Sequence, residues 1–171
     1  MTKRRAALGA ALGVALAVTP AALRGAEQAT KGEDGKYMTK DGVPTYRVAQ
    51  DGTVDWYTFS GFRRYHSDCH VCHGPDGEGS SYAPGLVEPL KKLTYEQFMD
   101  VVVNGRQKVS ASQQTVMPGF AQNTNVMCYI DDLYVYLKAR ADGALQRGRP
   151  AKREEKTQQA IQNENSCNPG G

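Results

Sequence analysis

The sequence has no apolar run long enough to cross a membrane. Its apolar stretch, Ala6 to Val18, has about 13 residues, whereas a membrane-spanning helix needs roughly 20. Lys3, Arg4 and Arg5 precede this stretch and small residues follow it, which is the order of a secretory signal peptide. We therefore predict that residues 1–25 are a signal peptide, with an approximate cleavage site, and that the exported protein keeps no membrane anchor.

The chain also lacks a net charge once its first 21 residues are removed. The whole sequence has 21 lysines and arginines against 18 aspartates and glutamates. The first 21 residues hold three of the basic residues and no acid, so 21 − 3 = 18 basic residues remain against 18 acidic ones. Such a balanced and scattered charge gives no indication of nucleic-acid binding. We interpret it as an ordinary solvated surface.

Cysteines are few, and only two of the four are close together. Two lie in the run Cys69-His70-Val71-Cys72-His73, whereas Cys128 and Cys167 are far from it and from each other. A zinc site would need a second close pair, and a thioredoxin-like pair would need a preceding strand. The run is the pattern of c-type haem attachment. We therefore predict haem thioethers at Cys69 and Cys72 and an axial imidazole at His73.

Two more histidines lie near the axial one. His70 occupies a variable position of the run, and His66 lies one helical turn earlier. Both fall on the same side of the haem as His73, so neither can bind the opposite face of the iron. We interpret both as exposed polar side chains.

A methionine is the candidate for the second axial ligand of the iron. Met99 and Met127 fall in predicted helices, and we interpret them as core residues. Met117 is followed by Pro118 and Gly119 in a predicted loop, from which a thioether can reach the far face of a haem. We therefore predict Met117 as the sixth ligand.

The sequence predicts three main helices. Gly61, Tyr65 and Cys69 recur every four residues and so share one helix face. Thr94 is a good N-cap with a glutamine in the capping-box position, and this second helix is expected to end at Asn104-Gly105. A third helix is predicted from about Asn125 to Ala141.

We predict that the rest of the chain forms extensions of this helical region. Two Asp-Gly pairs between short extended runs before the first helix predict one or two small strands. The C-terminal segment is strongly polar and is expected to lie on the surface, with at most a helical turn near Glu154 to Ile161. After the signal peptide, we predict an N-terminal extension at 26–57, a main domain at 58–143 and a polar tail at 144–171.

The region from Thr58 to Ala141 resembles the class I c-type cytochromes. Gly61, Tyr65 and Cys69 match the N-terminal helix of that family, and Asp132–Lys138 resembles the C-terminal helix that crosses it. The resemblance implies an all-α fold with three main helices around one covalently bound haem. A short β-hairpin-like extension would precede this fold, and the polar tail would follow it.

The same resemblance implies roles for several residues. Leu133 and Tyr136 should pack on Gly61 and Tyr65, where the two helices cross. Ala83-Pro84-Gly85-Leu86 resembles the family segment in which the proline carbonyl accepts a hydrogen bond from the proximal histidine. Pro84 would then orient His73 and tune its basicity.

A narrower resemblance concerns the Asp-Gly-rich extension and the second pair of cysteines. These features are similar to the four-cysteine c-type cytochromes related to methanol metabolism, which are associated with quinoprotein alcohol dehydrogenases. The resemblance implies a periplasmic one-electron carrier and not an enzyme. Its donor would be a PQQ-dependent alcohol or methanol dehydrogenase, and its acceptor another cytochrome or a terminal oxidase.

Three further expectations complete the interpretation. Cys128 and Cys167 are expected to form a disulfide that ties the tail to the third helix, because remaining cysteines of exported proteins usually pair.

A haem enzyme or ligand sensor, such as a peroxidase-like protein, is the alternative function. It would need an open or labile sixth iron position, and Met117 argues against it. Aromatic residues are expected to contribute to the haem pocket: Tyr65, Phe120, Trp56 and Tyr82.

Overall fold

The computed structural model describes residues 29–109 and 114–169, so the predicted signal peptide lies outside the described residues. The helices are α1 (Trp56–Asp68), α2 (His70–His73), the 3₁₀ helix η1 (Pro75–Gly77), α3 (Val87–Leu90), α4 (Tyr95–Asn104), α5 (Thr124–Met127), α6 (Ile130–Ala141) and α7 (Gln158–Cys167). The strands are β1 (Thr30–Lys31), β2 (Tyr37–Met38), β3 (Pro44–Thr45), β4 (Thr53–Val54), β5 (Arg106–Val109), β6 (Gln114–Met117) and β7 (Lys152–Arg153).

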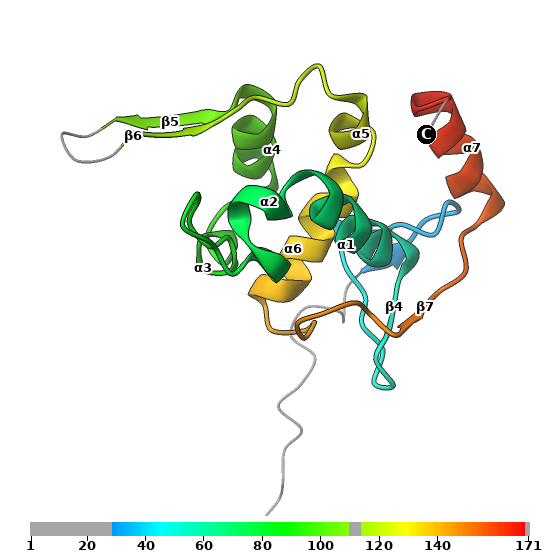
Figure 1. Cartoon of the computed structure of the whole chain (residues 1–171). Coiled ribbons are helices and arrows are strands. Elements are labelled where there is room, and N and C mark those ends of the chain that lie inside the picture. The colour runs from blue at the N-terminus through cyan, green and yellow to red at the C-terminus, as the bar shows by residue number, and fades with distance from the viewer. Residues whose placement is uncertain (1–28, 110–113, 170–171) are drawn as a thin grey trace, which may run out of the picture.

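Helices α1 and α6 cross at the centre of the molecule (Figure 1). A Cβ atom at Gly61 would lie 1.8 Å from the carbonyl oxygen of Asp132 and 2.7 Å from the Cβ of Tyr136. The rings of Tyr65 and Tyr136 are 5.6 Å apart, and both are fully buried. Leu133 is also buried in this core. The crossing therefore forms as the sequence predicts, because a residue without a side chain lets the two backbones approach.

The helix boundaries differ from the prediction in two places. Helix α1 begins at Trp56, two residues before the predicted main domain at 58–143, because the buried Asp55 caps it by accepting a hydrogen bond from the Thr58 N–H. The predicted third helix is divided into α5 and α6, because Tyr129 leaves the helical conformation (φ −127°, ψ 23°). The guanidinium of Arg64, in α1, lies 3.5 Å from the Tyr129 ring centroid. This contact holds the non-helical residue Tyr129 against α1.

The N-terminal extension forms a three-stranded antiparallel sheet in the order β1-β2-β3. The turn between β2 and β3 contains Gly42 at a φ of 77°, a conformation that favours glycine. Lys36 forms an ion pair with Asp131 at 2.6 Å, and the Tyr46 hydroxyl donates to Asp142 at 3.0 Å. The extension is therefore fastened to both ends of α6.

The tail is more ordered than its polar composition indicates. Strand β7 pairs in parallel with β4, and the tail then continues into α7 (Figure 1). Thr157 caps this helix by accepting from the Ala160 N–H, and Ala160 is buried. The helical turn predicted near Glu154 to Ile161 overlaps the start of α7, but the helix begins later, at Gln158, and extends to Cys167. The cap and a single buried alanine were too weak a pattern to identify the helix.

A disulfide joins the tail to the region before α6. Cys128 and Cys167 are bonded, with Cα atoms 5.7 Å apart and a sequence separation of 39. Asn168 also donates a hydrogen bond to Asn125 at 2.9 Å. The far end of α7 is therefore attached to α5 by one covalent and one polar contact.

Replacing both Cys128 and Cys167 with alanine is expected to lower the free energy of unfolding by about 3 to 4 kcal/mol, because the bond closes a loop of about 40 residues in the unfolded chain. Urea unfolding of the holoprotein measures this loss. The single variant Ser166→Ala, at an exposed site on α7, is the control and should not change the midpoint. A double variant as stable as the parent would show that the bond does not stabilise the fold.

A buried carboxylic acid lies in α6 at the helix crossing. Asp132 is 4% exposed, and burial raises its pKa from 3.8 to about 8. Native Asp132 therefore keeps a proton between pH 4 and pH 8 that the unfolded chain releases, so the free energy of unfolding falls as pH rises through this window.

Asp132→Asn is expected to weaken this pH dependence and to stabilise the protein at pH 8, because the amide never ionises. Urea unfolding at pH 5 and pH 8 tests this, with Asp41→Asn on the exposed β2–β3 turn as control. Equal losses of stability in the parent and in Asp132→Asn between the two pH values would show that Asp132 does not carry this pH dependence.

Candidate functional site

The two close cysteines lie where α1 ends and α2 begins. The Cys69 N–H donates to the Tyr65 carbonyl, and the His73 N–H donates to the Cys69 carbonyl. Both cysteines of this pair have free thiols. Burial raises the pKa of the Cys69 thiol to about 12, so it does not have the thiolate character of a redox-active pair.

His73 is buried and held in one orientation. Its Nδ1 lies 2.9 Å from the carbonyl oxygen of Pro84. Because a carbonyl oxygen only accepts, Nδ1 carries the proton and Nε2 keeps a free lone pair for a metal. The His73 carbonyl accepts from the Gly79 N–H at 2.7 Å. The backbone and the ring of His73 are thus both attached to the loop that follows it.

The loop after His73 is fastened to the helix crossing. The Tyr65 hydroxyl donates to the Gly74 carbonyl at 2.6 Å. Gly74 has a φ of 72°, and a Cβ there would lie 2.0 Å from the Gly79 carbonyl oxygen. This close approach explains why glycine occupies position 74.

A buried polar cluster around Asp76 was not predicted from the sequence. Asp76 is 5% exposed, has a φ of 57°, and accepts from the Tyr136 hydroxyl at 3.2 Å and the Gly148 N–H at 3.1 Å. Arg140 donates to the Asp76 carbonyl and forms an ion pair with Glu78 at 2.7 Å. These contacts join the loop to α6 and to the start of the tail. The Asp-Gly pair at 76–77 was the only local signal of this arrangement.

The histidines near the axial candidate are partly buried, which corrects the prediction of exposed side chains. The ring of His66 lies 4.2 Å from that of Phe62 and 5.5 Å from that of His70. Its Nδ1 is 2.8 Å from the Phe62 carbonyl oxygen, and its Nε2 is 3.7 Å from Asp76 Oδ1. The stacking of these rings from α1 and α2 accounts for this burial.

Met117 ends strand β6 and does not lie in a loop, which corrects a second prediction. The strand pairs with β5, and Arg106 lies opposite Met117. Met117 is half-buried and packs against the core. A Cβ at Gly105 would lie 2.5 Å from the Met117 carbonyl oxygen, and the Phe120 N–H donates to the Val102 carbonyl at 2.9 Å. The base of the hairpin is therefore fixed to the end of α4, while strands β5 and β6 project from the rest of the fold (Figure 1).

Of the aromatic residues expected near the haem, Tyr65 is fully buried and Phe120 is partly buried. Trp56 instead packs under the tail, because its indole N–H donates to Glu164 at 3.3 Å and Arg153 lies over its ring at 5.3 Å. Tyr82 is 78% exposed, so the structure does not place it in a pocket.

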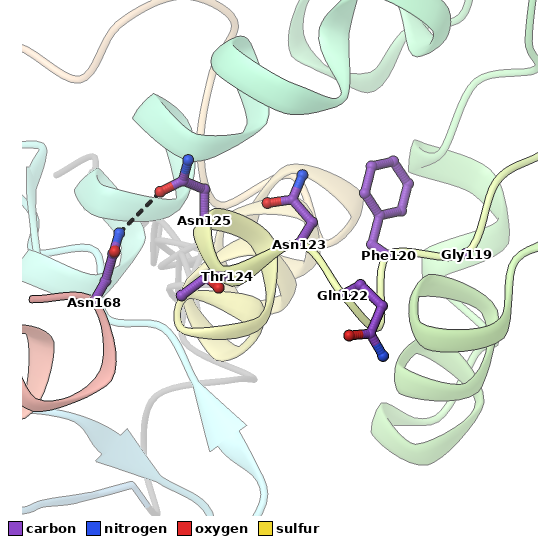
Figure 2. A pocket seen from close by; sticks show the side chains of 7 residues that line it. All are labelled: Gly119, Phe120, Gln122, Asn123, Thr124, Asn125 and Asn168. Atoms are coloured by element: carbon purple, nitrogen blue, oxygen red, sulfur yellow. Dashed lines mark hydrogen bonds between the residues drawn. The ribbon is translucent and has the colours of Figure 1, made fainter. Parts of the chain in front are cut away.

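A polar groove of about 590 Å³ is lined mainly by residues 119–125, which come shortly after Met117 in the sequence. Phe120 lies at one end, and the hydrogen-bonded pair Asn125 and Asn168 lies at the other (Figure 2). The groove contains neither the cysteine pair nor His73 nor Met117. Among the candidate haem-pocket residues, Phe120 lines the groove, whereas the proposed attachment and iron-binding residues do not.

The chemistry of the donor set fits a covalently attached haem. Two free thiols three residues apart match the two thioether positions of haem c. The buried imidazole of His73 has one nitrogen bonded and one available, and the backbone of Met117 is fixed at the base of its hairpin. Imidazole and thioether are an axial pair that haem iron takes in c-type cytochromes.

Comparisons with known proteins agree with this chemistry. Residues 59–137 match the family described as cytochrome c oxidase, cbb3-type, subunit III. The chain is 51% identical to cytochrome c-553I of Paracoccus denitrificans over 138 residues, which are 81% of this chain and 61% of that protein. The chain thus spans less than two thirds of that relative.

Two other relatives are matched over more of their length. Cytochrome c-555 of Methylococcus capsulatus is 43% identical over 96 residues, or 56% of this chain and 72% of that protein. The crystal structure of the c-type cytochrome XoxG from Methylobacterium extorquens AM1 matches with a TM-score of 0.73 and 54% identity. That match covers 81% of this chain and 85% of the other.

Proposed function

Because the chain belongs to the class I c-type cytochromes, we propose that it is a periplasmic electron carrier whose donor is a PQQ-dependent methanol or alcohol dehydrogenase. Its acceptor in this proposal is another cytochrome or a terminal oxidase. Membership of the family itself means that the chain binds haem c covalently and carries electrons, and is not an enzyme. Within the described residues, no helix has both the length and the apolar character of a membrane span.

In this proposal Cys69 and Cys72 hold the cofactor, and His73 binds its iron through Nε2. The bound haem iron supplies the one-electron couple. The Pro84 carbonyl keeps the proton on Nδ1 of His73 and fixes the plane of the ring, which increases the basicity of the ligand nitrogen. The hydrogen bond between His73 and Pro84, beside two free thiols, is the observation that carries this assignment.

Met117 is proposed to fill the sixth position in both oxidation states. Its half-buried side chain packs against the core, and the backbone on either side is fixed by the close approach at Gly105 and by the hydrogen bond from Phe120 to Val102. A ligand held in this way does not have to leave during electron transfer. The alternative of a peroxidase-like enzyme or ligand sensor requires that position to open, so this packing favours the carrier.

The proposed donor is supported by the four-cysteine pattern. The second pair of cysteines is bonded, and an ordered extension precedes α1, as the narrower sequence resemblance implied. Stopped-flow reduction of the ferric holoprotein by a purified PQQ-dependent methanol dehydrogenase, with methanol present, tests the assignment. We expect rapid reduction that requires methanol. Failure of the enzyme to reduce a protein that ascorbate reduces normally would refute this donor.

A further inference from the structure

Arg140 is a buried arginine near the end of α6, and each nitrogen of its guanidinium has an acceptor. The side chain is 7% exposed. Its Nε donates to the Asp76 carbonyl at 3.3 Å, its Nη1 to the Leu145 carbonyl at 2.6 Å, and its Nη2 to the Glu78 carboxylate at 2.7 Å. Charged side chains are rarely buried unless they are paired. These three contacts therefore hold the guanidinium in one place and hold its acceptors against α6.

Two of these acceptors lie in the loop after His73, one residue before and one residue after Gly77. The Gly77 carbonyl accepts from the Leu86 N–H at 2.7 Å, which closes the far end of the loop. The Gly79 N–H donates to the His73 carbonyl at 2.7 Å, which fixes the near end. The guanidinium therefore holds the loop at the place where both of its ends are attached.

The segment that the guanidinium holds packs directly against the segment that carries Pro84. A Cβ at Gly79 would lie 2.6 Å from the Gly85 nitrogen and 3.2 Å from the carbonyl carbon of Pro84. A Cβ at Gly85 would lie 2.9 Å from the Glu78 carbonyl oxygen. Because the two backbones are this close, one cannot shift without moving the other. The Pro84 carbonyl, which accepts from the His73 ring, is therefore positioned by the segment that the guanidinium holds.

The backbone conformation of Asp76 depends on such support. Its φ of 57° lies in a region that residues other than glycine rarely adopt, and such a conformation persists where the surrounding structure holds it. Asp76 Oδ1 accepts from the Tyr136 hydroxyl at 3.2 Å and from the Gly148 N–H at 3.1 Å. His66 Nε2 and Arg147 Nε approach its carboxylate at 3.7 and 3.6 Å. The loop after the axial candidate is thus held from outside by α1, α6 and the start of the tail.

We propose that Arg140 is a positioning residue for His73: it holds the loop so that the Pro84 carbonyl stays aligned with Nδ1 of the ring. The proposal rests on the proposed function and adds a distant residue that tunes its iron ligand. The hydrogen bond at Nδ1 raises the basicity of the ligand nitrogen, and a more basic ligand favours the ferric state of a bound haem. Loosening the loop weakens this hydrogen bond, so the midpoint potential of the holoprotein rises.

Arg140→Lys tests the proposal in the holoprotein, because it keeps the positive charge but loses the planar fork of donors. In the ferrous protein, the Leu86 amide hydrogen should exchange with solvent at least about tenfold faster, since a hydrogen bond to a charged group contributes at least that factor. The NMR signal of the His73 ring N–H should move to lower chemical shift, as a weaker hydrogen bond requires. The midpoint potential should rise.

Two further variants separate this effect from a general loss of stability. Arg64→Lys makes the same change at a half-buried arginine that stacks on Tyr129, and it should leave all three measurements unchanged. Glu78→Ala removes one acceptor of the Arg140 guanidinium at a side chain that is 42% exposed. It should speed exchange at the Leu86 amide severalfold, which is less than Arg140→Lys does.

The Phe98 amide, which donates to the Thr94 carbonyl in α4, reports stability away from the loop. Exchange at Phe98 that accelerates as much as at Leu86 would overturn the proposal, because Arg140 would then be only a general stabilising contact. Parent values for the His73 ring signal and the potential in Arg140→Lys would also overturn it. If the His73 ring of the parent lacks the large chemical shifts that a bound haem imposes on its axial ligand, the proposed ligand is wrong and this proposal falls with it. Failure at Arg140 alone leaves the electron carrier intact.

Discussion

Replacing Met117 with alanine is expected to lower the midpoint potential of the holoprotein and to remove the weak long-wavelength absorption band of ferric iron bound to a thioether. Sulfur ligation favours the ferrous state, and axial ligands set haem potentials over a range of roughly 0.8 V. We therefore expect a fall on the order of 0.1 V or more. Redox titration and the ferric spectrum measure the two effects. The variant should also bind carbon monoxide, because a coordination position opens.

The chain offers two matched controls for this prediction. Met99 and Met127 are also partly buried and packed against the core. Alanine at either position should reduce stability but keep the potential and the absorption band. If Met127→Ala or Met99→Ala lost the band while Met117→Ala kept it, the ligand assignment would be wrong.

Gly61→Ala is expected to destabilise the protein by about 3 kcal/mol, the upper end of the usual cost of overpacking. The new methyl group would lie 1.8 Å from the Asp132 carbonyl oxygen, and neither α1 nor α6 can yield without losing contacts elsewhere. Because Tyr65 and Tyr136 meet at the same crossing, separating the helices would also disturb the hydrogen bond from Tyr65 to the loop after His73. Urea unfolding of the holoprotein measures the loss.

Gly143→Ala separates this steric effect from backbone strain. Gly143 has a φ of 72°, and nothing lies within 4 Å of the position that a Cβ would take, so only a conformational cost of roughly 1–2 kcal/mol applies. Gly61→Ala should therefore be clearly the more destabilising of the two. Equal losses would contradict the importance of the close approach at the crossing.

The parts of the site that the sequence could predict are those with fixed local spacing. The attachment run lies within five consecutive residues, so its chemistry needs no knowledge of the fold. The helix face of Gly61 and Tyr65 follows from the helical period. The second helix was predicted from its capping box, which the structure contains at Thr94 and Gln97.

The features that were missed depend on contacts between distant segments. Strand β7 exists because it pairs with β4, about 100 residues earlier in the chain. The Asp76 cluster needs Tyr136 and Gly148, which only the folded chain brings near the loop. Met117 was expected in a loop because Pro118 and Gly119 follow it, and the pairing of β6 with β5 overrides that local pattern.

The most direct test of this account is mass spectrometry of tryptic peptides from the purified, coloured protein. We predict that the peptide from Tyr65 to Lys91 carries the mass of one haem bound through Cys69 and Cys72. The peptides that contain Cys128 and Cys167 should be joined to each other and carry no haem. Recovery of the peptide from Tyr65 to Lys91 with two free thiols and no added mass would contradict the central claim.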